Sequence, residues 1–241
     1  MRYGAIINGI LIIAGGILGL LFGKFVTEKI KDTVIKGIGV SVMLMGAGGT
    51  LSRMFVVSGS AISTQGSVML VVCMALGAVC GEAIDIDGAM ERFGEWLKIK
   101  TGNAKEGGFV DAFVTTTLIV GVGAMAVMGS ITDGLSGDNT ILVIKSVIDL
   151  ITVCFLSSAM GKGCLFSFIP VLLFEGLLTL LAGVLAPVMT DAALSALSLV
   201  GNSMMIMIGI NMFREKTFRA GNYLPALIFA VLWALLKLPM T

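Results

Sequence analysis

The chain is organised around a central segment, Gly129-Ser-Ile-Thr-Asp-Gly-Leu-Ser-Gly-Asp138-Asn-Thr-Ile-Leu-Val-Ile-Lys145-Ser-Val-Ile-Asp149. Its first half combines glycines, which tolerate positive φ, with aspartates that can bond the local backbone; this is the chemistry of a turn or a re-entrant segment. We predict an entrance or gate here, where the aspartates attract a cation or simply cap a solvated turn. Its residues are Gly129, Asp133, Gly134, Gly137 and Asp138. The second half enters an apolar helix whose Lys145 and Asp149 share one face, because they are four residues apart.

The composition is that of a polytopic membrane protein. Hydrophobic residues make up 57% of the 241 residues and charged residues only 13%, whereas soluble domains average about 25% charged residues. The net charge of +1 argues against nucleic acid as a partner, and the absence of histidine excludes a His-based metal site or general base. The four cysteines lie in or beside apolar runs, so we interpret them as small apolar residues and expect no disulfide, metal or cofactor.

Eight apolar runs are candidates for bilayer crossings, each of which takes about 20 residues in a helix. They are 4–23, 34–57, 66–83, 109–130, 140–160, 165–186, 194–213 and 222–239. The third run is short and the fourth ends in the glycine-rich segment, so seven spans or a re-entrant segment remain open. The predicted fold is an all-α transmembrane bundle that forms a single membrane domain. The first run is expected to be retained as a span, because no small-x-small cleavage site follows it.

Lys and Arg residues are distributed unequally between the predicted loops. Twelve lie on the side of the loops that follow the first, third, fifth and seventh spans, and three lie on the opposite side. The twelve are Lys24, Lys29, Lys31, Lys36, Arg92, Lys98, Lys100, Lys105, Lys162, Arg214, Lys216 and Arg219, and the three are Arg2, Arg53 and Lys237. Because positive charge marks the cytoplasmic side, both termini are predicted outside, with an even number of spans.

The longest predicted loop, 84–108, carries an amphipathic pattern. Met90, Phe93, Trp96 and Leu97 recur at helical spacing beside charged residues. We predict a helix that lies at the cytoplasmic interface with its tryptophan as an anchor. A helix that binds a partner or regulates the protein is the alternative.

Two pairs of spans resemble each other in the same order. Residues 16–23 match 176–183 at five of eight positions, and residues 39–45 match 201–207 at four of seven. Five crossings separate the members of each pair, so the copies would face opposite ways, as in many transporters. We predict an inverted 3+3 repeat of spans 1–3 and 6–8 around a central span 4–5 hairpin; chance similarity of Leu- and Gly-rich helices is the alternative. The regions are 1–83 (first repeat), 84–108 (cytoplasmic loop), 109–162 (central hairpin) and 163–241 (second repeat).

Three glycines in the first span, Gly15, Gly19 and Gly23, are spaced by four residues. Such a face lets another helix approach closely. It predicts either packing within the chain or the interface of a homodimer.

Charged residues at membrane depth mark the candidate binding site. Asp149 lies 12 residues before Gly161 and Glu175 lies 12 residues after Gly163, so both lie about 18 Å from the intervening turn. Lys145 could pair with either carboxylate, which leaves one negative charge for a proton or a cation. The expected ion- or substrate-binding residues are Asp149, Lys145, Glu175, Asn8, Ser146 and Asn202. A buried ion pair that only joins two helices is the alternative.

Several of these motifs resemble one known family. The motifs are Gly123-Ala-Met125, Gly129-Ser-Ile-Thr-Asp-Gly-Leu-Ser-Gly-Asp138, Lys145-Ser146 with Asp149, and Ile169-Pro170. They resemble the bacterial inner-membrane family known as domain of unknown function 554, and the resemblance extends over the whole chain. It implies a multi-pass protein of the bacterial inner membrane, with the character of a transporter whose substrate is unidentified.

The function predicted from these features is membrane transport of a small ion or solute, by an ion-coupled secondary transporter. An ion channel that uses 129–138 as a re-entrant filter or gate is the main alternative. A membrane scaffold or sensor is a further one. An enzyme is not expected, because the chain lacks histidine, a nucleophile beside a base, and metal-ligand spacing. The expected partners are the lipid bilayer and the transported species.

Overall fold

The computed structural model describes residues 3–58, 61–214 and 217–238. Arg2 and Lys216 of the charge count, and the last residue of the predicted run 222–239, lie outside these residues. The chain divides into two compact units. Unit 1 contains the residues up to Ile38 together with Gly88–Leu185, and unit 2 contains Gly39–Asp87 together with the residues from Ala186 onward.

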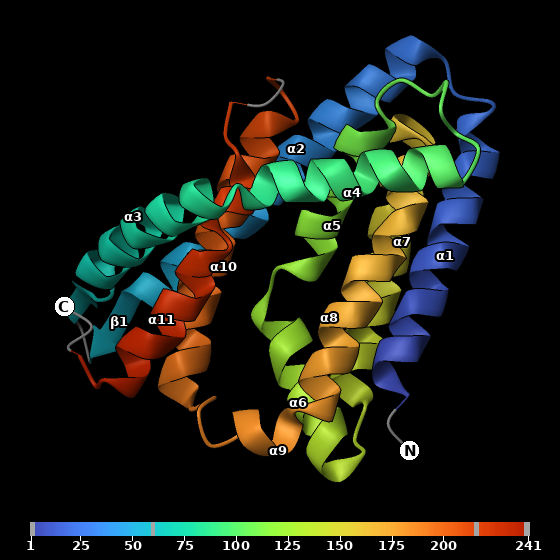
Figure 1. The fold of residues 1–241 in the computed structure, drawn as a ribbon. Helices are drawn as coiled ribbons and strands as arrows, with labels where there is room; N and C mark the ends of the chain where they lie inside the picture. The colour runs from blue at the N-terminus through green and yellow to red at the C-terminus, as the bar shows by residue number, and fades with distance from the viewer. Residues whose placement is uncertain (1–2, 59–60, 215–216, 239–241) are drawn as a thin grey trace. The chain divides into compact units, whose positions relative to one another are not determined.

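The described residues are mostly helical (Figure 1). In chain order the elements are α1 (Gly4–Gly23), α2 (Glu28–Met54), β1 (Phe55–Ser58), β2 (Ala61–Thr64), α3 (Ser67–Ile84), α4 (Ile86–Lys100), α5 (Phe109–Gly121), α6 (Ala124–Ser136), α7 (Thr140–Met160), the 3-10 turn η1 (Lys162–Ser167), α8 (Phe168–Leu180), α9 (Ala182–Leu185), α10 (Asp191–Asn211), the 3-10 turn η2 (Ala220–Tyr223) and α11 (Pro225–Leu235).

The predicted all-α class is confirmed, and a short antiparallel hairpin of β1 and β2 interrupts one of the predicted spans. Phe55 pairs with Thr64 at its open end. The helix α2 ends at Met54, so the predicted span 34–57 stops short of its expected end. Aromatic and β-branched residues on both sides of a glycine favour strands over helix, and this signal was hidden in an apolar run.

Six helices among the described residues are long and apolar enough to cross a membrane. The pair α5 and α6 passes the same test together but is bent by 62°, which raises the count to at most seven. The predicted eighth span is represented by the shorter apolar helix Ala220–Leu235. The seven-span alternative therefore fits the helix lengths better than the count of eight. The predicted fourth span is two helices rather than one.

The glycine face of α1 packs within unit 1 against α7. A Cβ added at Gly15, Gly19 or Gly23 would lie closer than 3.0 Å to the carbonyl oxygen of Leu150, Cys154 or Ser158, respectively. The three glycines of α1 are four residues apart, and so are the three residues of α7 that they face. The two helices are therefore in close contact over two turns. The intramolecular alternative is the one observed. The three glycines are covered by α7 in this arrangement.

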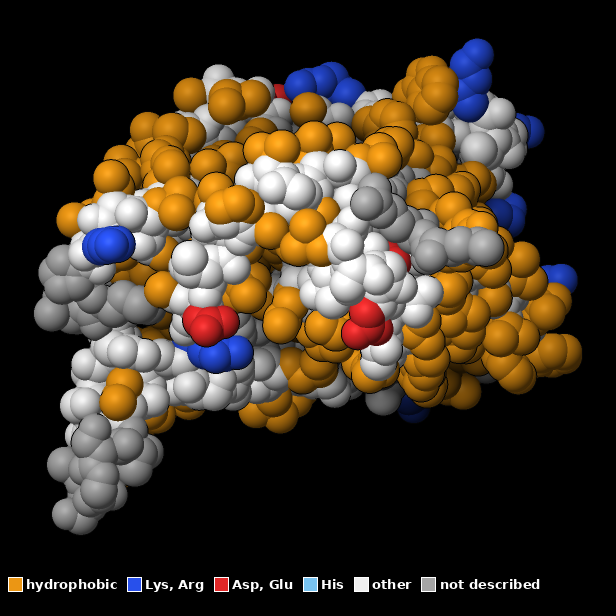
Figure 2. All heavy atoms as spheres, turned by 90° about the horizontal axis from the view of Figure 1, so that it is seen from below, with side chains coloured by type: hydrophobic (Ala, Val, Ile, Leu, Met, Phe, Trp, Pro, Cys, Tyr) orange, Lys and Arg blue, Asp and Glu red, His pale blue; other side chains and the backbone are white. Residues whose placement is uncertain are grey.

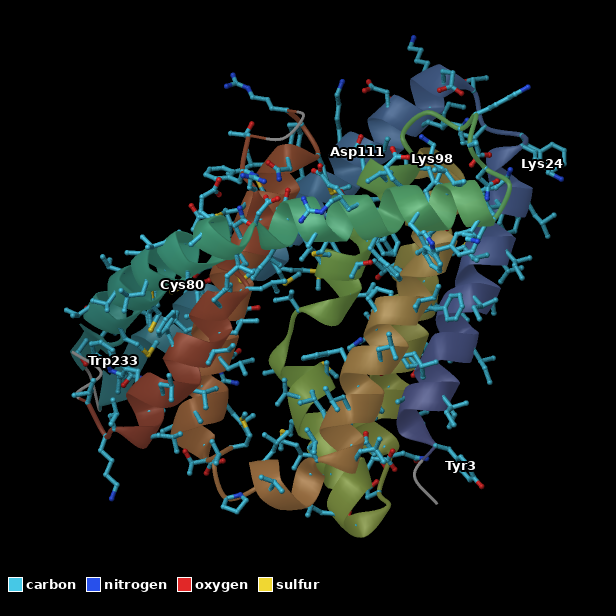
Figure 3. The ribbon with its side chains drawn as sticks, in the orientation of Figure 1. Tyr3, Lys24, Cys80, Lys98, Asp111 and Trp233 are labelled. Carbon is cyan, nitrogen blue, oxygen red and sulfur yellow. The ribbon has the colours of Figure 1, made fainter. Side chains whose placement is uncertain are left out.

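The predicted amphipathic helix is present as α4. Leu97 is buried with Phe109 and Phe113 of α5, and Phe93 lies against both Phe113 and Trp96. Trp96 itself is half exposed. In Figure 3, Lys98 of α4 and Lys24 lie at the same end of unit 1, whereas Tyr3 lies at the opposite end of α1.

Helices of unit 2 pack in matched pairs. Gly46 of α2 faces the carbonyl oxygen of Asn202 in α10, and Gly209 of α10 faces the carbonyl oxygen of Gly39 in α2. In the same way α3 packs against α11, where Gly77 faces Ala226. Small residues thus set the helix spacing in both units.

Hydrophobic side chains cover much of the molecular surface. Figure 2 shows one face on which they greatly outnumber charged side chains. Leu44, Ile148 and Leu177, on three different long helices, are all exposed. Such a surface is stable in lipid and not in water, which agrees with a membrane protein.

We expect Gly19→Ala to destabilise the protein by about 1–3 kcal/mol, because the new methyl group collides with the backbone of α7. Gly48→Ala in α2 is the matched control: it lies in open space and should be neutral or slightly stabilising. Thermal unfolding in detergent measures both variants. Equal melting temperatures would contradict the packing described for α1.

Candidate functional site

The centre of unit 1 contains an ion-pair cluster carried by α7 and α8. The ammonium of Lys145 pairs with the carboxylate of Asp149 one turn further along α7. It also lies 3.2 Å from Oε1 of Glu175 on α8. The side chains of Lys145 and Asp149 are 8% and 7% exposed, and that of Glu175 is fully buried. The two carboxylates lie at one depth on neighbouring helices, as their spacing from the intervening turn predicts.

Asn8 of α1 orients the Glu175 carboxylate. Its side-chain amide nitrogen donates to both carboxylate oxygens, at 2.9 and 3.0 Å. The close approach of α1 to α7 is what lets this short side chain reach the cluster. The remaining amide oxygen, Asn8 Oδ1, is buried and has no hydrogen-bond partner.

A break between α5 and α6 supplies the remaining oxygen of the cluster. Lys145 Nζ donates to the carbonyl oxygen of Val120 at 2.8 Å, in the last turn of α5. Carbonyl groups in the last turn of a helix lack intrahelical partners and favour a nearby cation. This ligand was not among the residues predicted from the sequence. The available signal was the pair Gly121 and Gly123, since two glycines so close together weaken a helix.

The cluster carries a formal charge of −1 when all groups are ionised, because two carboxylates face one ammonium. Charges at this depth are costly unless they are paired. An ion pair that only joined two helices would need one carboxylate. The second carboxylate leaves one negative charge that a proton or a monovalent cation could balance.

The predicted entrance segment 129–138 is mostly helix, which corrects the prediction of a turn, whereas the 62° bend between α5 and α6 fits either a broken span or a re-entrant segment. Gly129 and Gly134 lie inside α6, against Leu142 and the backbone of Thr179, respectively. Their role is close packing rather than backbone turning, which is why the turn prediction failed. Of the three predicted turn glycines only Gly137, with φ of 74°, has a turn conformation.

Asp133 and Asp138 have different roles. Asp138 is exposed and accepts hydrogen bonds from the hydroxyl and backbone N–H of Thr140, and these lower the pKa of its carboxyl. Asp138 therefore caps a solvated turn, which is the simpler of the two roles predicted for the aspartates. Asp133 is fully buried and accepts from the backbone N–H of Gly4 at 3.0 Å, so the prediction of a solvated position for it was wrong.

Two predicted site residues make their bonds elsewhere. The hydroxyl of Ser146 donates to the carbonyl oxygen of Leu142 within its own helix. Asn202 belongs to unit 2, where it donates to Ser198 and packs against Gly49. Of the six residues expected to bind, Lys145, Asp149, Glu175 and Asn8 are therefore brought together.

Both units contain a surface pocket. In unit 1 a pocket of about 720 Å³ lies at the Lys24 end of α1 and reaches Ser157 of α7. In unit 2 one of about 640 Å³ lies beside Arg219, which pairs with Glu82 and Asp85. The Arg219 pairs join the end of α3 to η2 and were not anticipated from the sequence. Among the described residues no group of three or more His, Cys, Asp or Glu side chains could hold a metal ion.

Comparison with known proteins gives a family without an assigned activity. A family model described as Protein of unknown function (DUF554) matches residues 3–235. The uncharacterized membrane protein YdfK of Bacillus subtilis is 24% identical over 227 residues, which cover 94% of this chain and 93% of YdfK. The uncharacterized protein YqgA of Escherichia coli is 23% identical over 240 residues, which cover 96% of this chain and 95% of YqgA. No solved structure matches. The resemblance expected from the Gly/Asp segment is confirmed.

We expect Lys145→Met to destabilise the protein by about 3–5 kcal/mol, because it leaves two buried carboxylates without a cation. A second change, Asp149→Asn, should restore much of that stability. Lys36→Met is the control: Lys36 forms an exposed pair with Asp32, also four residues apart, and its loss should cost less than about 1 kcal/mol. The readout is unfolding in detergent. A Lys145→Met variant as stable as Lys36→Met would show that the cluster is not held by charge.

Proposed function

Because this chain belongs to the DUF554 family of membrane proteins of unknown function, its activity must be argued from its own geometry, and we propose that it is an ion-coupled secondary transporter of a small ion or solute. The observation that carries the proposal is the cluster of Lys145, Asp149 and Glu175, with its single unbalanced negative charge, lying against a broken membrane helix. Ionisable groups inside a membrane are functional by default.

Broken helices are the usual places where transporters bind their ions. A helix interrupted in the membrane exposes carbonyl groups and N–H groups that can hold an ion, and irregular backbone is tolerated where it lines a site. Here the break between α5 and α6 leaves the carbonyl oxygen of Val120 bonded to Lys145. An incoming monovalent cation could bind among the same oxygens beside the ammonium, where it would balance the remaining negative charge.

Packing between corresponding helices supports the proposed inverted repeat. The predicted pairs are α1 with α8, α2 with α10, and α3 with α11, and each pair is in contact. The contact of α2 with α10 is reciprocal: Gly46 faces Asn202 and Ile206, while Gly209 faces Gly39 and Met43. A two-fold relation between two copies produces contacts of this kind. Each unit also draws helices from both copies.

The alternatives have less support. A channel that uses 129–138 as its filter needs backbone carbonyl groups that point into a pore, and most of these residues are helical. The scaffold or sensor alternative rests on α4, whose apolar side is partly used by packing on α5. We assign no enzymatic activity.

We further propose that the protein resides in the bacterial inner membrane with both termini outside, which requires α11 to complete an even number of crossings.

Reconstitution into proteoliposomes tests the proposal. Charge movement is recorded after concentration jumps of protons, Na⁺ or K⁺. We expect Asp149→Asn to reduce it at least about tenfold, because a buried charge contributes more than about 1.4 kcal/mol to ion binding.

Asp32→Asn, which removes the acid of an exposed pair of the same spacing, is the control and should match the wild type. If Asp149→Asn and Asp32→Asn gave equal charge movements, the assigned site would be wrong.

A further inference from the structure

Many hydroxyl groups on the described helices donate to a carbonyl group of their own helix. Serine and threonine commonly donate to the carbonyl group one turn earlier. Those that donate to the residue four positions earlier in their own helix are Thr33, Thr132, Ser136, Ser146, Thr152 and Ser203. Five buried hydroxyl groups, all in unit 1, have no partner: Thr116, Thr117, Ser130, Ser157 and Thr179. A buried hydroxyl without a partner is costly, so these five need an explanation.

Two of the five unbonded hydroxyl groups belong to α6 and α8, the two helices that pack together next to Asp133. Ser130 precedes Asp133 by three residues and therefore shares its face of α6. Thr179 of α8 lies at the contact with α6, where its backbone oxygen meets Gly134. Ser130 is fully buried and Thr179 is 5% exposed.

The Asp133 carboxylate also has an oxygen that accepts no hydrogen bond. One carboxylate oxygen accepts from Gly4, while the other, Oδ1, is buried and has no partner. No Lys or Arg in the described part of the chain forms an ion pair with it. Capping of α1 explains only one of its two oxygens. An ionised carboxylate this deeply buried requires a counter-cation.

Two helices place the Asp133 group one turn from the ion-pair cluster. On α1, Gly4 bonds Asp133 and Asn8 bonds Glu175, four residues later. On α8, Thr179 follows Glu175 by four residues. Four residues correspond to about 6 Å of helix. A cation at Asp133 would therefore be one short step from the cluster.

We propose that Asp133, Ser130 and Thr179 form a second subsite, which binds a dehydrated monovalent alkali-metal cation, Na⁺ or K⁺, on its way to the cluster. The inference rests on the proposed transport function. The three free oxygens, Asp133 Oδ1, Ser130 Oγ and Thr179 Oγ1, are hard ligands of the type that such cations prefer. One cation charge balances the single carboxylate, whereas a divalent ion would leave an excess. The two hydroxyl groups distinguish a metal cation from a proton, which needs the carboxylate alone.

The test uses Ser130→Ala, Thr179→Val and Asp133→Asn in the full-length protein reconstituted into proteoliposomes. Charge movement is measured against Na⁺ and K⁺ concentration, with choline keeping the ionic strength constant. We expect each variant to raise the half-saturating concentration of the transported cation about tenfold or more, since each removes a ligand of a charged group. Thr132→Val is the matched control, because its hydroxyl lies on α6, is not buried and is bonded to the carbonyl oxygen of Met128; the variant should behave as the wild type.

Thermal unfolding separates binding from folding. Loss of an unbonded hydroxyl should leave the melting temperature without cation unchanged or higher, and Asp133→Asn keeps an acceptor for Gly4. Stabilisation by added Na⁺ or K⁺ should shrink in all three variants.

Three results would overturn the subsite. In the first, Asp149→Asn abolishes charge movement while the three variants keep the wild-type half-saturation; the proposed function then stands without the subsite. In the second, only proton jumps drive charge movement. In the third, Asp149→Asn changes nothing, and the proposed function fails together with the subsite.

Discussion

The ammonium of Lys145 joins three membrane helices at one point. It contacts a carboxylate on its own helix, a carboxylate on α8 and a backbone carbonyl of α5, and all of them are shielded from water. Desolvating these charges is costly, so the contacts hold only while every partner is in place. Because three polar partners face one ammonium, a second cation that competes for these partners would weaken the contacts of α5, α7 and α8 together. This is a physical route from ion binding to a change in the helix arrangement.

Small residues create the geometry that the cluster requires. The glycine row of α1 lets that helix lie against the backbone of α7, and Asn8 thereby reaches Glu175. Gly134, next to Asp133, lets α6 lie against the backbone of α8 in the same way. In a membrane, close backbone contact replaces the hydrophobic effect as the force that holds helices together. The glycines therefore determine which polar groups meet, although they carry no chemistry themselves.

The sequence was sufficient for the centre of the site and insufficient for its surroundings. Counting residues from a turn placed Asp149 and Glu175 at one depth, because helix rise is constant. Ser146 and Asn202 were chosen for polarity alone, which does not indicate the direction of a side chain or the unit to which it belongs. Asp133 was placed in solvent because glycines were read as turn residues, whereas in α6 they serve packing. The break after Gly121 and the hairpin after Met54 were hidden inside apolar runs, since hydropathy does not distinguish a helix from an interrupted one.

Equilibrium binding of a radioactive alkali-metal cation to the purified protein tests the central claim, that the unbalanced charge of the cluster is a cation site. We expect saturable binding of sodium or rubidium to the wild type, and loss of that binding when Asp149 and Glu175 are changed together to Asn and Gln. Equal binding by the wild type and the doubly neutralised variant, or no saturable binding by either, would contradict it.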